Sequence, residues 1–275
     1  MRRTVGIAFF IFLIGACGAR CENAGLRNWR SQPPADDSNP LKQLIPGEDF
    51  LPPRLRAQQA DDFDNPAYPA VEAGERAWST PEGLAGKSCQ TCHGASRSIA
   101  IKQAAASYPK YAPDVKQVIT LETRINICRR NNLRAVALNE TSEQLIAMSA
   151  YLRWVARGLP SAVSVTGPSA EIFEHGKQLF YTKMGLLKLS CAQCHNERYG
   201  EKFGGETLSQ GHPLAYPAYK VSEGRVITLH ERFQFCNKLV RAEPQPENSP
   251  DYIALELYLN WRSKNLPITA PGVRR

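Results

Sequence analysis

The sequence predicts a mainly α-helical protein, built from two tandem domains that are related by an internal repeat and preceded by an extended N-terminal arm. Three observations favour this class. The pattern C-x-x-C-H occurs twice, the segments around the two copies recur in the same order, and the segment closing each copy carries apolar residues at three- and four-residue spacing. A chain of 275 residues is long enough to give both copies a hydrophobic core.

The chain begins with a stretch typical of a secretory signal. Arg2 and Arg3 precede the apolar run Val5 to Ala16, which is too short to span a bilayer. Small side chains favour cleavage after position 19, which makes residues 1–19 a signal peptide. The alternative is a lipoprotein signal that ends before Cys17 and leaves this cysteine as a lipid anchor. Both signals predict export to the periplasm, and no other apolar run is long enough to form a transmembrane segment.

Residues 22–70 differ in composition from the rest of the chain. They are rich in Pro, Asp and Gln, which predicts an arm that is laid over the domains or partly disordered. The formal net charge of +8 includes arginines of the signal, and the remaining excess suits acidic proteins or anions as partners. Nucleic acid is not an expected partner, because the chain is exported and has no dense basic stretch.

The two C-x-x-C-H motifs, "CQTCH" at 89–93 and "CAQCH" at 191–195, predict two covalently bound haem c groups. In this pattern two thiols bond the porphyrin edge and the adjacent histidine ligates the iron. The alternatives are CxxC disulfides, redox-active pairs, or one zinc site shared by both motifs. The predicted attachment cysteines and proximal histidine are Cys89, Cys92 and His93 for the first haem, and Cys191, Cys194 and His195 for the second.

The repeat extends well beyond these motifs. Gly74 and Gly176 each lie 15 residues before the first motif cysteine, in "GERAW" and "GKQLF", whose aromatic residues are expected near the haem edge. "YPKY" and "YPAY" begin 20 residues before Cys128 and Cys236, and "VITL" recurs between them. Closing helices carry "YLRWVARGLP" (151–160) and "YLNWRSKNLP" (258–267). We therefore expect cytochrome c-like domains at 71–160 and 171–275, joined by a linker at 161–170.

Each haem iron is also expected to have a second axial ligand, which in c-type haem is usually a Met or a His. The three methionines are Met1, Met148 and Met184, so none follows Cys191. Met148 falls in the apolar stripe of a closing helix, where a core role is expected. His212 and His230 are paired by the repeat with Ala104 and Glu122, which cannot ligate iron in the same way.

Cys128 and Cys236 are the equivalent residues in the two copies, and they are the predicted distal ligands. The alternative is a disulfide between them, which an oxidising compartment permits. A thiolate is a strong anionic donor that favours ferric iron, so both haems are expected to have low reduction potentials.

The chain resembles the SoxA family, the dihaem catalytic subunits of SoxAX cytochromes in bacterial thiosulfate oxidation. The resemblance rests on both CxxCH motifs, on "HERFQFCNKLVRAEP" and on the ending "LELYLNWRSKNLPITAPGVRR". It implies an L-cysteine S-thiosulfotransferase that joins thiosulfate oxidatively to a cysteine of the SoxYZ carrier. Electrons would then pass through haem to the monohaem subunit SoxX, the partner in a heterodimer, and on to a cytochrome c acceptor.

The resemblance also implies roles for individual residues. Cys236 corresponds to the active-site cysteine, which carries a persulfide, and Arg232 to the residue that binds the anionic substrate. Cys128 corresponds to the distal ligand of the first haem. Read without the family, Arg232 and Cys236 share a helix face at i, i+4, and a guanidinium offers paired donors to a sulfonate-like anion.

Spacing alone does not identify the active copy, because Arg124 also lies four residues before Cys128. In a simpler interpretation, each arginine pairs with a haem propionate. His230 and Lys238 are further candidates for contact with the anion. The alternative functions are a dihaem thiosulfate dehydrogenase that forms tetrathionate, a dihaem electron carrier without catalysis, and a dihaem peroxidase, which would need an open iron site.

Overall fold

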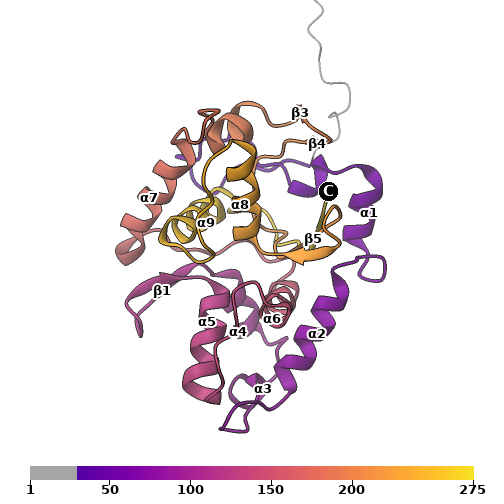
Figure 1. Cartoon of the computed structure of the whole chain (residues 1–275), viewed down its shortest axis with the longest axis vertical. Coiled ribbons are helices and arrows are strands. Elements are labelled where there is room, and N and C mark those ends of the chain that lie inside the picture. Colours follow the sequence, from indigo (N-terminus) through magenta and orange to yellow (C-terminus); the bar gives the residue numbers. More distant parts are fainter. Residues whose placement is uncertain (1–29) are drawn as a thin grey trace, which may run out of the picture.

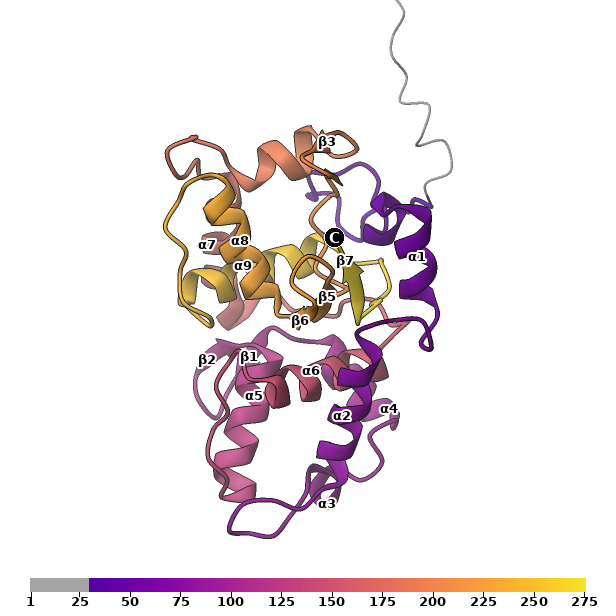
Figure 2. The same cartoon turned by 45° about the vertical axis from the view of Figure 1, so that its right-hand side comes forward.

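The computed structural model describes residues 30–275, which form two helical halves stacked one on the other (Figure 1). The predicted signal peptide, Cys17 and Cys21 lie outside the described residues. The first half occupies the lower part of Figure 2 and the second half the upper part. None of the helices in residues 30–275 has the length and apolar character needed to span a bilayer.

The first half is built around a crossing of two helices, α2 (Tyr68–Ser79) and α6 (Glu143–Val155). Gly74 makes the close approach possible, because a Cβ on this residue would lie 2.1 Å from the carbonyl oxygen of Ala147. Between these helices the chain forms, in order, α3 (Cys89–His93), α4 (Ile99–Ala106), β1 (Lys110–Ala112), β2 (Gln117–Ile119), α5 (Leu121–Cys128) and the π-helical turn η2 (Arg129–Leu133).

The second half repeats this plan with α7 (Ala170–Tyr181) crossing α9 (Pro250–Arg262). Gly176 takes the place of Gly74, since a Cβ here would lie 2.0 Å from the carbonyl oxygen of Ala254. The turn η3 (Gly167–Ser169) precedes α7. The intervening elements are η4 (Gln193–Glu197), β3 (Lys202–Phe203), β4 (Glu206–Thr207), β5 (Ala218–Lys220), β6 (Arg225–Ile227) and α8 (Leu229–Leu239). The predicted helical class and its repeat are confirmed.

Short hairpins deliver the chain to α5 and α8 in the two halves. β1 pairs antiparallel with β2, and β5 with β6, in the same register relative to the repeat. Thr120 and Thr228 then cap the helices, each accepting a hydrogen bond from the backbone N–H three residues on, at Thr123 and Glu231. Only the second hairpin gains a third strand, β7 (Gly272–Arg274), which runs parallel to β5.

The arm lies against the second half, as the indigo segment beside β5 in Figure 1 shows. Its middle was predicted as extended, yet it forms the turn η1 (Gly47–Phe50) and the helix α1 (Pro53–Ala60). Proline suits the first turn of a helix, where its missing N–H costs no intrahelical bond, and this explains the start of α1. Three pairs fasten the arm: Ile45 N–H to Gln210 Oε1 (2.8 Å), Asn65 Nδ2 to Pro271 O (3.0 Å) and Arg274 Nη1 to Gln59 Oε1 (2.6 Å).

Each half has its own core. The first core centres on Tyr151, Leu145 and Val71, all at most 1% exposed, and the second on Tyr258, Leu257 and Phe180. The segment that follows α9 returns to the first half and adds buried apolar side chains, Leu266, Ile268 and Ala270, to the first core. The two halves are therefore joined by shared packing as well as by the chain.

Candidate functional site

The first candidate site is an apolar cavity of about 950 Å³, including the space at its mouth, inside the first half. Cys89, Cys92 and His93 of α3 line one wall, and Cys128, the last residue of α5, lines another. Apolar side chains of α2, α5 and α6 make up most of the rest. Two thiols, an adjacent imidazole and a thiolate donor around an apolar cavity fit a haem c group.

Local capping holds the first CxxCH motif in place. Ser88 caps α3 and forms a capping box with Thr91. The indole Nε1 of Trp78 donates to the carbonyl oxygen of Gly94 (3.2 Å), and its ring centroid lies 5.7 Å from that of His93. The aromatic residue of "GERAW" is therefore beside His93, the predicted iron ligand. Burial raises the pKa of Cys89 to about 11.

Met148 also lines this cavity, from within the core cluster of the first half. The repeat aligns it with Leu255, which has no atom able to ligate iron, whereas Cys128 aligns with Cys236. Equivalent positions in the two halves therefore favour the cysteines as the ligand pair. All six cysteines in residues 30–275 are free thiols, so the alternative disulfide between Cys128 and Cys236 does not form.

The second CxxCH motif is held by a different set of contacts. The Nδ1–H of His195 donates to the carbonyl oxygen of Ser209 (2.7 Å), which leaves Nε2 for a metal. Burial lowers the pKa of His195 to about 4, so the imidazole stays neutral, as a ligand must be. Gly211 packs against this ring, because a Cβ there would lie 3.0 Å from His195 Cγ.

Cys236 of α8 faces the second motif. Burial raises the pKa of Cys191 to about 12, and the nearby Cys236 thiolate adds to the shift; the same two causes raise the pKa of Cys194. The thiol groups of Cys191, Cys194 and Cys236 thus share one buried environment with His195, the same donor set as in the first half, and they fit a second haem c.

Arg232 lies one turn before Cys236 on the same face of α8. Burial alone would lower its pKa, but the negative charges of Cys236, Tyr216 and Glu206 raise it. The guanidinium Nη2 lies 3.5 Å from Glu206 Oε2, and Cζ lies 5.0 Å from the ring centroid of Phe235. Arg232 is therefore a fixed positive charge beside the sulfur of Cys236.

Arg124, the counterpart of Arg232, is engaged differently. It forms a bidentate ion pair with Asp114, in the turn between β1 and β2: Nη1 to Oδ2 is 2.7 Å and Nη2 to Oδ1 is 2.8 Å. This pair lowers the pKa of Asp114 to about 2. A guanidinium whose paired donors are already taken by a carboxylate has none left in that geometry for an anion.

The other candidate histidines are committed elsewhere. In His212, Nδ1 is bonded to Ser263 Oγ (2.9 Å) and Nε2 to Gln210 Oε1 (3.0 Å). In His230, Nε2 is bonded to Glu256 (3.1 Å), and Nδ1 accepts from the N–H of Asn248 (3.0 Å). Both ring nitrogens of each are occupied, so neither ligates iron, and the interpretation of His230 as an anion contact is not supported. Lys238 is exposed on α8.

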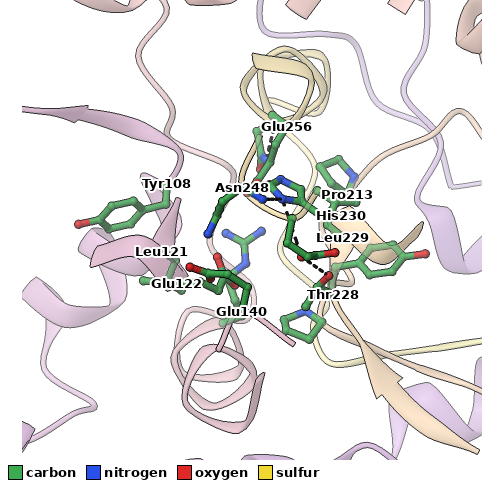
Figure 3. A pocket seen from close by; sticks show the side chains of 15 residues that line it. Tyr108, Leu121, Glu122, Glu140, Pro213, Thr228, Leu229, His230, Asn248 and Glu256 are labelled. Carbon is green, nitrogen blue, oxygen red and sulfur yellow. Dashed lines mark hydrogen bonds and ion pairs between the residues drawn. The ribbon is translucent and has the colours of Figure 1, made fainter. Parts of the chain in front are cut away.

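His230 lies instead in a cavity between the two halves (Figure 3). The first half contributes Glu122 of α5, Glu140 of the loop before α6, and Arg153 of α6. The second half contributes Glu247 of the loop before α9, and Glu256 of α9. The imidazole sits between Glu256 and the loop that carries Glu247 and Asn248. This cavity is a buried polar contact between the halves, separate from either cysteine site.

Comparison with known proteins identifies the family. Residues 73–161 and 175–268 match the family described as SoxA/TsdA, cytochrome c domain. L-cysteine S-thiosulfotransferase subunit SoxA of Pseudaminobacter salicylatoxidans is 35% identical over 242 residues, which are 88% of this chain and 84% of that protein. The chain belongs to the SoxA family.

Further relatives agree with this assignment. The SoxA subunit of Rhodovulum sulfidophilum is 34% identical over 245 residues, 89% of this chain and 85% of the relative. The crystal structure of SoxXA from P. pantotrophus superposes with a TM-score of 0.84 at 30% identity and covers 90% of this chain and 93% of that chain. The resemblance to SoxA and the cytochrome c fold class are thereby confirmed, and haem c is the cofactor type that the cytochrome c domain implies.

Three features of the second site were missed by sequence reasoning. They are the Ser209 carbonyl that orients His195, the carboxylate of Glu206 beside Arg232, and the buried Lys220 described below. The repeat held a signal for two of them. His93 lies 15 residues before Tyr108 (108 − 93), but His195 lies 21 before Tyr216 (216 − 195), and Ser209 and Glu206 fall in this longer segment.

Proposed function

We propose that this SoxA chain joins thiosulfate oxidatively to a cysteine of a SoxYZ carrier, with Cys236 as the catalytic residue and Arg232 as the substrate-binding residue. The assignment to an L-cysteine S-thiosulfotransferase follows from membership of the SoxA family. The observation that carries the choice of Cys236 over Cys128 is the state of the two arginines. Both terminal nitrogens of Arg124 are paired with Asp114, whereas Arg232 faces a single carboxylate oxygen, Glu206 Oε2, at 3.5 Å.

The reaction has a simple balance. The sulfur of one carrier thiol forms an S–S bond with the outer sulfur of one thiosulfate, which keeps its sulfonate group. This step releases one proton and two electrons. Haem c supplies the one-electron redox chemistry by which these electrons reach a monohaem SoxX subunit and then a cytochrome c acceptor. Two haems are expected, held by Cys89, Cys92, His93 and Cys128 in the first half and by Cys191, Cys194, His195 and Cys236 in the second.

The residues around Cys236 support this chemistry. A sulfur carried as a persulfide on Cys236 is polarizable and able to form and break S–S bonds. Arg232 projects from the same face of α8 and would hold the sulfonate oxygens of thiosulfate, so that the outer sulfur meets Cys236. Cys191 and His195 are partly buried, so the inner side of the site is shielded from bulk solvent.

Partner and location complete the proposal. We infer a heterodimer with SoxX, because the matched crystal structure is of SoxXA. The predicted signal supports a periplasmic location, with Cys17 as a possible anchor if the lipoprotein signal is used. We also propose that the two cytochrome c-like domains comprise residues 71–160 and 171–275, with residues 161–170 as the linker.

The test uses the holoprotein with SoxX, thiosulfate, the carrier and oxidised cytochrome c. The carrier is expected to gain one thiosulfonate group by intact mass, with reduction of two equivalents of cytochrome. Cys236→Ala is expected to abolish both signals, while Cys128→Ala retains carrier modification and changes the spectrum of the first haem. Equal loss in the two variants would contradict the assignment of catalysis to the second half.

A further inference from the structure

Lys220 is a buried cation at the second site that has no counterpart in the first half. It ends β5, its side chain is only 4% exposed, and the repeat aligns it with the buried Ala112 at the end of β1. Its Nζ lies 3.3 Å from Glu206 Oε1, donates to the backbone oxygen of Arg275, and lies 4.7 Å from the ring centroid of Phe235. Burying an ammonium group is costly unless it has partners, and these three contacts hold Lys220 at the site.

Glu206 bridges this lysine and the arginine of the site. One carboxylate oxygen faces Lys220 at 3.3 Å and the other faces Arg232 at 3.5 Å. Both cations also lie over the ring of Phe235, the residue that precedes Cys236. Two positive charges therefore converge on the ring of Phe235, with Arg232 near Cys236, and a single negative side chain is shared between them.

The residue that supplies this negative charge differs between the two halves. Glu206 belongs to the small β3–β4 hairpin, in the segment that is longer in the second half, and its side chain is 34% exposed. The first half lacks this arrangement: its arginine is held by Asp114, whose counterpart in the second half is Ser222. The second half has thus replaced the bidentate partner of the arginine with a carboxylate that is shared between two cations, and it has added a lysine.

We propose that Lys220 and Arg232 together form a two-cation site for the sulfonate end of thiosulfate, and that Glu206 occupies it in the free protein. This inference rests on the proposed function and names the residues that select its substrate. Thiosulfate is a dianion whose tetrahedral central sulfur carries three oxygens. It therefore matches the charge of two cations better than the single negative charge of the Glu206 carboxylate does. When thiosulfate enters, the hairpin carries Glu206 outward into solvent, and both cations gain charge-assisted hydrogen bonds.

The experiment is calorimetric titration of thiosulfate into the holoprotein without carrier or acceptor. Lys220→Met is expected to weaken thiosulfate binding by roughly tenfold or more, the effect of losing a charge-assisted bond. Glu206→Gln is expected to strengthen binding several-fold, because the competing charge is gone. Asp114→Asn is the matched control, since it breaks the carboxylate–guanidinium pair of the first half and leaves thiosulfate affinity unchanged.

Removal of Lys220 alone leaves Glu206 with one partner fewer, so a double variant keeps the test decisive if that protein is unstable. Lys220→Met with Glu206→Gln removes both charges and is expected to bind thiosulfate more weakly than Glu206→Gln alone. Equal affinity in these two proteins overturns the proposal. So does a Lys220→Met variant that shifts the haem potential but not the thiosulfate affinity, the result expected if the lysine pairs with a haem propionate.

The outcomes separate this inference from the proposed function. If the variants change thiosulfate affinity as expected but the wild-type protein does not modify the carrier, the anion site stands and the function fails. If the carrier is modified and Lys220→Met binds thiosulfate like the wild type, the function stands and the two-cation site is wrong.

Discussion

The Cα of Gly74 lies directly against the backbone of Ala147, where a Cβ would be 2.1 Å from the carbonyl oxygen. Gly74→Ala is therefore expected to force α2 and α6 apart and to lower the free energy of unfolding by about 1–3 kcal/mol. Thermal melting of the purified protein measures this. Gly47→Ala is the control, because the nearest atom to its new Cβ is 3.6 Å away; equal melting temperatures for the two variants would refute the close packing.

Gly211 is predicted to position His195 through simple contact. Gly211→Ala would place a Cβ 3.0 Å from the imidazole at a backbone φ of +75°, so we expect a tilted ring and a changed absorbance or potential of the second haem. Gly224→Ala is matched in backbone strain, with φ of +67°, but its nearest neighbour is 4.0 Å away. Both variants should lose about 1 kcal/mol of stability, and only Gly211→Ala should change the haem. A similar spectral change in both would point to strain alone.

Gln210 is expected to hold the arm on the second half. It is 0% exposed, accepts from the N–H of Ile45 (2.8 Å) and donates to the carbonyl oxygen of Gln43 (3.0 Å). Gln210→Ala leaves these groups unpaired, which costs about 1–3 kcal/mol for each buried one, and should speed proteolysis within residues 30–60. Gln43→Ala removes an exposed side chain of the same kind and should be cut like the wild type. Unchanged proteolysis of Gln210→Ala would disprove the fastening.

The cavity between the halves predicts a pH dependence of stability. Burial raises the pKa of Glu247 to about 7 from 4.5, so the folded protein retains a proton there that the unfolded chain releases. Burial favours neutral His230, but the hydrogen bond and charge of Glu256, with the charge of Glu247, raise its pKa above 6.5. Stability should therefore fall as pH rises from about 5 through 7, since both groups lose their stabilising proton in that direction.

Glu247→Gln tests this pH dependence by removing one titrating group. The other charged groups facing the cavity are Glu122, Glu140, Arg153 and Glu256, and they remain in the variant. Melting temperatures measured from pH 5 to 8 are expected to decline less steeply in Glu247→Gln than in the wild type. Glu243→Gln, at an exposed position nearby, should keep the wild-type slope; a slope changed equally by both variants would rule out the cavity as its origin.

Much of the fold could be predicted because the repeat consists of short motifs that recur in the same order along the chain. The repeat predicted equivalent helices at the start and end of each half; that Gly74 and Gly176 lie where these helices cross, and that Thr120 and Thr228 cap α5 and α8, are findings of the structure. The helix α1 was not predicted, since its residues Pro53–Ala60 carry no apolar stripe and it is held by distant partners. Attachment of the arm to β7 involves residues more than 200 positions apart, which no local pattern reveals.

The sequence predicted which cysteines and histidines gather at each site, but not what surrounds them. The spacing of Arg232 and Cys236 put them on one helix face, but the same spacing in Arg124 and Cys128 left the halves equivalent. What distinguishes them is the identity of the carboxylate that meets each arginine, Asp114 or Glu206, and this depends on how the hairpins fold back. The surroundings of His230 could not be predicted for a similar reason, because its partners Glu256 and Asn248 come from α9 and the loop before it.

The placement of the arm makes the upper half a discontinuous unit. Residues 30–65 precede the first half in the chain, yet they bind Gln210, Pro271 and Val273 of the second half. The first half is therefore inserted in the sequence between two segments that pack together. The core of the inserted half includes Leu266, Ile268 and Ala270, so this half is completed only when the segment after α9 packs against it. The second half likewise reaches its final form only when two distant ends of the described chain have met.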